Sequence, residues 1–202
     1  MKRLISSIAL ALAAALTLAG CGGNDASTSS ATSSSSSSNF NDADVTFAQS
    51  MIPHHQQAVQ MAKMATTKAS SPEVQQLAGK VEAAQGPEIE TMTGWLEDWG
   101  KKAPSDSTSG MGHGSDHDMD SMGSGDMPGM MTDADMKKLD GASGPGFDQM
   151  FLTMMIEHHT GAIDMAKTEQ SDGKNADAVA LAKKIEADQT AEVAQMKQLL
   201  KS

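Results

Sequence analysis

The sequence is poor in several residue types on which common functions depend. Its 202 residues include one cysteine, Cys21, and no tyrosine. A single cysteine excludes an intramolecular disulfide and a thiolate metal site, so any metal must be held by His, Met, Asp or Glu. Basic residues are also scarce, with 15 Lys and Arg against 26 Asp and Glu. Such an acidic chain is a poor partner for nucleic acid or an anionic membrane surface, but it is compatible with gathering cations.

The start of the chain is typical of an export signal rather than of a folded element. A basic start precedes an apolar run over residues 4–18, which is too short and wrongly flanked to span a membrane. Leu18-Ala19-Gly20-Cys21 resembles the bacterial lipobox, which implies lipid on Cys21; an ordinary secretory signal with a stray cysteine is the alternative. We therefore expect a lipoprotein signal peptide over residues 1–20. The mature protein is expected outside the cytoplasm, anchored by lipid to a bacterial cell membrane on its periplasmic side or at the cell surface.

A long internal repeat organises the rest of the chain. Met51-Ile52-Pro53-His54-His55 recurs 104 residues later as Met155-Ile156-Glu157-His158-His159. The correspondence runs without a gap from Asp44/Asp148 to Leu96/Leu200. A match of this length indicates that one supersecondary unit has been duplicated.

Each copy has the apolar spacing of two helices joined by a short turn. Apolar residues recur at steps of three and four over residues 42–69 and 72–99, and again over 147–168 and 176–200. One helical hairpin exposes an apolar face that it cannot cover alone. We therefore expect an all-α fold in which two duplicated hairpins form a four-helix bundle with pseudo-two-fold symmetry.

The composition divides the chain into five parts. The segments flanking the first hairpin are rich in Ser or in Gly, Ser, Asp, Met and His, and they read as a flexible tether and a long crossover linker. The expected parts are the signal peptide at 1–20, the lipidated Cys21 and Ser-rich tether at 21–40, hairpin 1 at 41–100, the linker at 101–146 with a short helix near 132–140, and hairpin 2 at 147–202.

Both histidines of each pair border the inward stripe of their helix. In each hairpin, counting residues outward from the turn along both helices places polar side chains of the second helix opposite the histidines of the first. The side chains at these levels are Gln85, Glu88, Gln189 and Glu192. Buried polar groups are costly unless partnered, so a mirrored set favours a metal held by the histidines, with a carboxylate or amide on the second ring nitrogen. The alternative is that the histidines hydrogen-bond across a helix interface.

The residues around the histidines indicate which metal fits. Ferritin-like di-iron bundles place Glu three residues before His, whereas Met51 and Met155 occupy those positions here. Thioether with imidazole selects copper, above all Cu(I), over iron, manganese or magnesium, although another divalent metal stays open. Methionine at helical spacing also fills cores, which is the competing interpretation. The candidate ligands are His54, His55, His158, His159, Met51, Met61, Met155 and Met165.

The linker holds a second, separate candidate site. Methionine and histidine alternate there with aspartate, and a tract of this composition can wrap a soft cation without a preformed pocket. A solvated low-complexity spacer is the alternative. The candidate ligands are Met111, His113, His117, Met119 and Met122.

The two copies together resemble a known family. Phe-x-x-x-Met-Ile-Pro-His-His-Gln-Gln-Ala-Val-x-Met-Ala, starting at Phe47, and its counterpart starting at Asp148 are similar to the exported family of domain of unknown function 305. The resemblance covers Asp44 to Leu200 apart from the Met/His-rich segment. It implies a ferritin-like four-helix bundle. Because CopM-type members are associated with copper binding and resistance through Met and His, it also implicates, by position, the eight bundle ligands named above.

Three functions fit these observations. The first is a membrane-anchored copper-binding protein that buffers copper, chaperones it to a delivery partner or confers resistance, with no catalytic residue. The second is a ferritin-like oxidoreductase acting on Cu(I) or Fe(II), although the missing Glu argues against iron. The third is a metal-free helical module of the cell envelope, in which the histidines are structural. We favour the first, a binding protein rather than an enzyme, and leave the oligomeric state open.

Overall fold

The computed structural model describes residues 39–104 and 127–202, and within these ranges the chain forms helices and no strand. The helices are α1 (Asp42–Lys68), α2 (Pro72–Asp98), α3 (Asp133–Gly141), α4 (Gly144–Asp172) and α5 (Ala176–Leu199). The expected signal peptide and most of the tether fall outside the described residues, as do the five linker ligands at 111–122.

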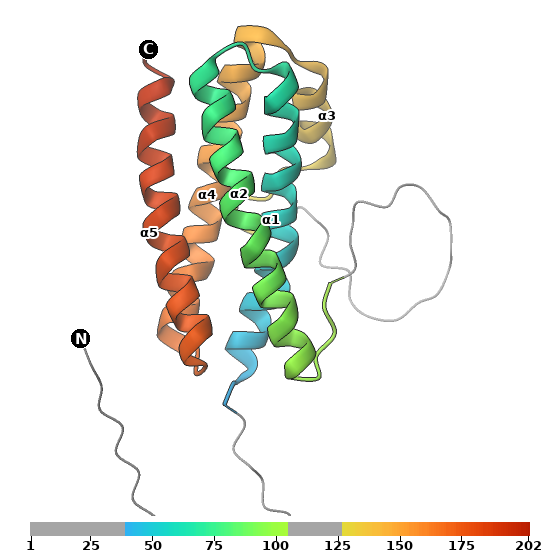
Figure 1. The fold of residues 1–202 in the computed structure, drawn as a ribbon, viewed down its shortest axis with the longest axis vertical. Coiled ribbons are helices and arrows are strands. Elements are labelled where there is room, and N and C mark those ends of the chain that lie inside the picture. Colours follow the sequence, from blue (N-terminus) through green and yellow to red (C-terminus); the bar gives the residue numbers. More distant parts are fainter. Residues whose placement is uncertain (1–38, 105–126) are drawn as a thin grey trace, which may run out of the picture. The chain divides into compact units, whose positions relative to one another are not determined.

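Two antiparallel hairpins make up the bundle (Figure 1). Helix α1 pairs with α2 and α4 pairs with α5, and the two hairpins meet chiefly through α1 and α4. The short helix α3 lies at the edge of the bundle against α1 and α4. The expected all-α four-helix bundle of two duplicated hairpins is confirmed. Within the described ranges, none of these helices has an apolar stretch long enough to cross a membrane.

Local sequence signals set the helix ends. Ser71 caps α2 with Pro72 in the first turn, and the Asn175 side chain accepts from two backbone N–H groups at the start of α5. Helix α4 begins at Gly144 rather than at residue 147, because a proline suits the first turn of a helix. Hairpin 2 therefore starts three residues earlier than the sequence suggested.

Each hairpin also accepts hydrogen bonds from the turn of the other hairpin. Asp148, near the start of α4, accepts hydrogen bonds from the backbone N–H groups of Ser70–Ser71 at 3.0 and 2.9 Å. Its counterpart in the repeat, Asp44 near the start of α1, accepts from the backbone N–H groups of Lys174–Asn175 at 3.0 and 2.9 Å. The duplication thus ties both ends of the bundle by the same carboxylate-to-turn contact.

The apolar core is split into two clusters. One lies toward the α1–α2 turn and includes Met61, Phe151 and Met155. The other lies toward the α4–α5 turn and includes Met51 and Ala162. In both α1 and α4 the doubled histidine falls between these clusters, so a polar layer crosses the middle of the bundle.

Candidate metal centre

Four histidines meet in the layer between the two apolar clusters. His54 and His55 come from α1 and His158 and His159 from α4, and all four have an exposed fraction of 0%. The ring centroids of His54 and His158 are 3.7 Å apart, with 39° between the ring planes. Those of His158 and His159 are 6.3 Å apart. The duplication has therefore gathered the four imidazoles inside the protein.

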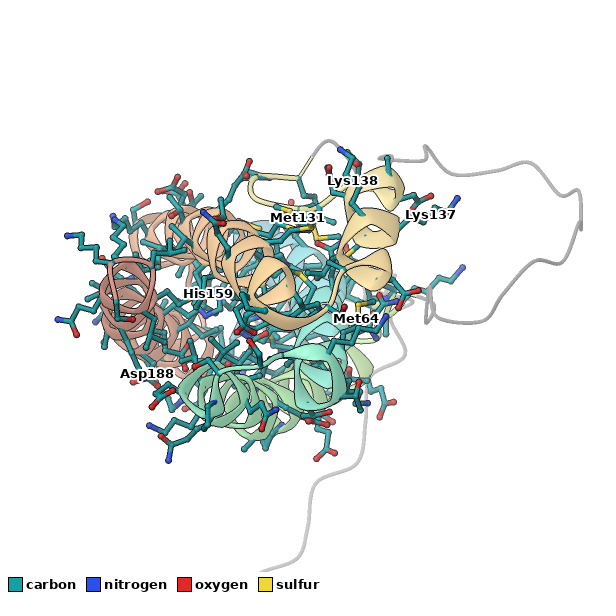
Figure 2. All side chains as sticks on the ribbon, turned by 90° about the horizontal axis from the view of Figure 1, so that it is seen from above. Met64, Met131, Lys137, Lys138, His159 and Asp188 are labelled. Carbon is teal, nitrogen blue, oxygen red and sulfur yellow. The ribbon has the colours of Figure 1, made fainter. Side chains whose placement is uncertain are left out.

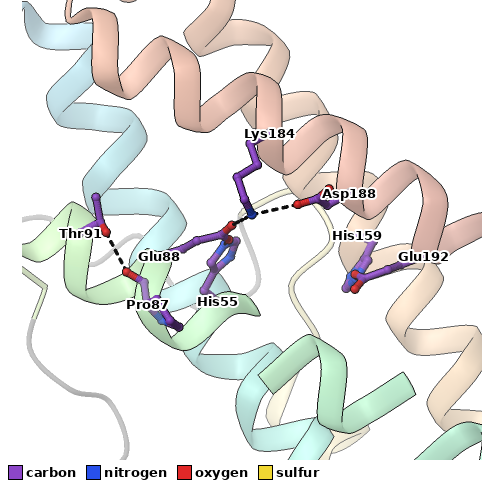
Figure 3. Close-up of polar contacts among 8 residues, drawn as sticks. All are labelled: His55, Pro87, Glu88, Thr91, His159, Lys184, Asp188 and Glu192. Atoms are coloured by element: carbon purple, nitrogen blue, oxygen red, sulfur yellow. Dashed lines mark hydrogen bonds and ion pairs between the residues drawn. The ribbon is translucent and has the colours of Figure 1, made fainter. Parts of the chain in front are cut away.

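One histidine of each pair is hydrogen-bonded to a glutamate of the neighbouring helix (Figure 3). His55 Nε2 lies 2.9 Å from Glu88 Oε2, and His159 Nε2 lies 2.7 Å from Glu192 Oε2. An ionised carboxylate only accepts hydrogen bonds, so each Nε2 donates and each Nδ1 is left with its lone pair. This is the partner arrangement that orients metal-binding histidines in proteins.

The carboxylates, rather than the amides of the same layers, are the partners of these histidines. Gln85 and Gln189 are buried beside them, yet neither side-chain oxygen has a hydrogen-bond partner within the described residues. Layer counting alone left Gln and Glu as alternatives, and the geometry assigns the contact to Glu88 and Glu192.

The two copies differ in what holds the glutamate. Lys184 of α5 donates to Glu88 Oε1 at 2.8 Å and to Asp188 Oδ2 at 2.9 Å, which links α5 to α2 (Figure 3). Burial raises the pKa of Glu88, but the hydrogen bonds from His55 and Lys184 outweigh it and leave that pKa below its ordinary value. Lys80, the counterpart of Lys184, lies exposed on α2. The first copy therefore carries the more firmly fixed carboxylate.

Burial favours the neutral form of three of the imidazoles, which is the form that binds metals. Burial, with His55 nearby, lowers the pKa of His54 to about 3. Burial also holds the pKa of His158 well below its ordinary value, and it lowers that of His55 despite the opposing contact with Glu88. These rings need no deprotonation before they can coordinate an ion.

Several ring nitrogens in this layer have no hydrogen-bond partner within the described residues. They are Nδ1 of His54, His55, His158 and His159, and Nε2 of His158. Unpartnered polar atoms in a core are costly and call for an explanation. A bound ion would supply the missing partner for these atoms, so the residues present fit a metal.

The candidate methionines lie on either side of the histidine layer. Met51, Met61 and Met155 are fully buried, whereas Met165 is only partly buried. Across residues 39–104 and 127–202, no three side chains of the His, Cys, Asp and Glu types are grouped to hold an ion. A bound ion would therefore combine imidazoles with thioethers, or the rings would have to shift.

One partner of the histidine layer was not predicted. The backbone carbonyl of Pro128, in the segment before α3, lies 3.1 Å from His54 Nε2 and accepts its hydrogen bond. Periodicity says nothing about such a contact, because it is made by irregular backbone. The one local signal is that the repeat has Gln57 in one copy and Gly161 in the other, beside this segment.

The chain is a helical-bundle protein, and comparison with known sequences identifies its family. The profile of the family described as a domain of unknown function (DUF305) matches residues 44–200. The chain belongs to the DUF305 family, as its two motifs indicated. No protein of the curated set matches its sequence.

Solved structures of similar proteins have the same fold. A DUF305 protein from Streptomyces coelicolor is 31% identical with a TM-score of 0.66, over 78% of this chain and 91% of that one. CopM in its Cu(II)-bound form is 34% identical with a TM-score of 0.63, over 78% of this chain and 95% of that one. A DUF305 fragment from Deinococcus radiodurans is 25% identical with a TM-score of 0.65, over 79% and 96%.

Proposed function

We propose that this protein binds copper as cargo at the buried histidine layer, and that it buffers the ion or passes it to a partner. The observation that carries this proposal is the group of buried ring nitrogens that have no hydrogen-bond partner within the described residues. Three of the rings are oriented by hydrogen bonds from Nε2, to Glu88, to Glu192 and to the Pro128 carbonyl. CopM, which has been solved with Cu(II), Cu(I) and silver bound, supports the choice of metal.

The composition of the layer favours Cu(I) over harder ions. Imidazole and thioether are ligands that select soft copper, while iron, manganese and magnesium prefer carboxylate-rich sites. Met51 and Met155 stand three residues before the histidines and are fully buried. The ligands that we propose remain His54, His55, His158, His159, Met51, Met61, Met155 and Met165.

We also propose that the protein acts outside the cytoplasm, tethered by lipid on Cys21, and that the linker captures copper for the bundle. These proposals are supported by the lipobox-like start and by the Met/His composition around residues 111–122. A Cys21→Ser variant is expected to leave the membrane fraction of a bacterial host. An unchanged distribution would contradict the anchor.

An anaerobic Cu(I) titration against a chromophoric chelator tests the bundle site. The double variant His54→Leu, His158→Leu keeps the buried volume and removes the closely spaced ring pair, so it should lose the tightly held ion. A variant with serine in place of the linker methionines and leucine in place of its histidines should retain that ion. Added Cu(I) should raise the melting temperature of the wild type and not that of the histidine variant, because a ligand of the folded state stabilises it.

Other results would overturn the proposal. Full-affinity uptake by the histidine variant would exclude the bundle site. Oxygen consumption on adding Cu(I) or Fe(II) would favour the oxidoreductase, and a melting temperature that ignores both copper and chelator would favour the metal-free module.

A further inference from the structure

A short irregular segment lies directly against the histidine layer. We call residues 127–132, between the linker and α3, the strap. The Pro128 carbonyl accepts the hydrogen bond from His54 Nε2 at 3.1 Å, and Met131 is buried with an exposed fraction of 5%. Seen from above, Met131 lies on the same side of the bundle as α3, opposite Asp188 of α5 (Figure 2). The strap therefore covers the histidine layer on the side of the bundle where α3 lies.

Helix α1 binds the strap through the side-chain amide of Gln57, which pairs with the strap backbone as a peptide group would. Gln57 Oε1 accepts from the Met131 backbone N–H at 2.8 Å, and Gln57 Nε2 donates to the Met131 carbonyl at 2.9 Å. One side chain thus satisfies both backbone polar groups of one strap residue. Because Gln57 lies three residues after His54, about one helical turn away, the grip is next to the ring that the strap contacts.

Helix α4 accommodates the strap by lacking a side chain. A Cβ added at Gly161 would lie 2.0 Å from the Pro128 carbonyl oxygen. A Cβ added at Gly129, which has a φ of 78°, would lie 2.8 Å from the backbone oxygen of His158. The strap backbone therefore touches the backbone of α4 beside His158, and any larger residue at Gly161 would push it away.

The two residues that accommodate the strap, one on α1 and one on α4, occupy equivalent positions of the repeat. Gln57 and Gly161 are 104 residues apart, in a stretch where both copies otherwise keep the doubled histidine and the following Ala and Met. The copies have diverged here into an amide that binds the strap and a glycine that makes room for it. Helix packing within each hairpin does not explain this divergence, whereas the strap explains both residues.

We propose that the strap is a positioning element of the metal site, set in place by Gln57 and Gly161. Its Pro128 carbonyl holds the Nε2–H of His54, which fixes the ring and leaves the Nδ1 lone pair for the ion. The strap performs for His54 what the glutamates perform for His55 and His159. It also covers the ring pair, so copper enters and leaves when the strap lifts. This inference rests on the proposed copper site for its role, although the contact itself is independent of copper.

The contact is tested first in the copper-free protein. By proton NMR, the ring N–H of His54 should be protected from exchange with water, as should those of His55 and His159. In Gln57→Ala the His54 signal alone should exchange roughly 30-fold faster, the factor expected when about two hydrogen bonds no longer hold the strap down. In Gly161→Ala the same signal should also exchange faster, because the added Cβ displaces the Pro128 carbonyl. Gln57→Glu keeps an acceptor but loses the donor, so its effect should be intermediate.

Copper release is the second readout. Transfer of Cu(I) from the loaded full chain to a chelator should be faster in Gln57→Ala and Gly161→Ala by a similar factor. The matched controls are Gln60→Ala, on the exposed side of the same helix, and Gly79→Ala, where an added Cβ meets nothing within 4 Å. Both controls should behave as wild type.

The two proposals fail in different ways. If the wild type binds no copper, the proposed function is wrong, while the His54 exchange measurement still decides whether the strap docks as described. If copper binds but His54 exchange and copper release are unchanged in both docking variants, the strap inference is overturned and the proposed function stands.

Discussion

At the scale of single residues, the site depends on which atom accepts the hydrogen bond from Nε2 of a histidine and leaves Nδ1 for the ion. A carboxylate on Nε2 orients the ring and raises the basicity of Nδ1. Glu192 serves His159 in this way, and among the described residues no lysine pairs with it, since Lys184 binds Glu88 of the other copy. Glu192 is thus the cleaner position at which to measure the contribution of the carboxylate.

Replacing Glu192 by Gln should weaken Cu(I) binding by roughly 10- to 100-fold, because the amide carries no charge and orients the ring less firmly. The affinity would be measured by competition with a chelator. Glu90→Gln, at an exposed position on α2, is the control and should leave the affinity unchanged. An affinity of Glu192→Gln within about twofold of wild type would show that the His159 contact is structural only.

At the scale of elements, the hairpins are fixed by their turns as much as by their apolar faces. Asp148 of α4 accepts from two backbone N–H groups and from the Ser70 hydroxyl at the α1–α2 turn. These N–H groups belong to the end of one helix and the start of the next, where no intrahelical acceptor is at hand. The carboxylate therefore orders the turn and docks hairpin 2 onto it.

Asp148→Ala should lower the free energy of unfolding by about 2–4 kcal/mol, since hydrogen bonds to a charged acceptor are lost and turn N–H groups are left unpaired. Asp148→Asn, which keeps a neutral acceptor, should lose less. Urea denaturation measures both, with Asp164→Ala on the exposed face of α4 as the control. If Asp148→Ala is as stable as that control, the contact contributes nothing to docking.

Periodicity and the repeat were sufficient to predict the helices and the interior position of the histidines. They could not separate Glu88 from Gln85, because residues three apart share a helix face and only the side-chain geometry selects one. The contacts of Asp44 and Asp148 with the opposite turns depend on how the hairpins dock, which no local pattern encodes. The contact between His54 and the Pro128 carbonyl could not be predicted either, because irregular backbone has no periodic sequence pattern.

At the scale of the whole molecule, the same carboxylate-to-turn contact has different surroundings at the two ends of the bundle. Asp148 is partly buried, whereas Asp44 is fully buried beside Glu169, whose exposed fraction is 1%. Burial raises the pKa of Asp44, but the backbone N–H groups that it accepts from outweigh this and lower the pKa below its ordinary value. Asp44 is therefore the charged member of the pair.

Glu169 is the protonated member. Burial, with the neighbouring Asp44, raises the pKa of Glu169 to about 8. Its oxygens have no hydrogen-bond partner within the described residues, so nothing offsets the cost of burying a charge there. A proton on Glu169 therefore removes the repulsion between two buried carboxyl groups, one at the start of α1 and one near the end of α4.

This proton makes stability depend on pH. Between the ordinary pKa of 4.5 and the raised pKa of about 8, the folded state holds a proton that the unfolded state has released. The free energy of unfolding should therefore fall as pH rises through this window, by about 3–5 kcal/mol for this group in copper-free protein. Glu169→Gln is uncharged at every pH, so the variant should lack this slope and should be more stable than wild type above pH 8. Urea denaturation across the window measures this, with exposed Glu157→Gln as the control. Parallel pH profiles for wild type and Glu169→Gln would mean that Glu169 is not protonated in the folded state within this window.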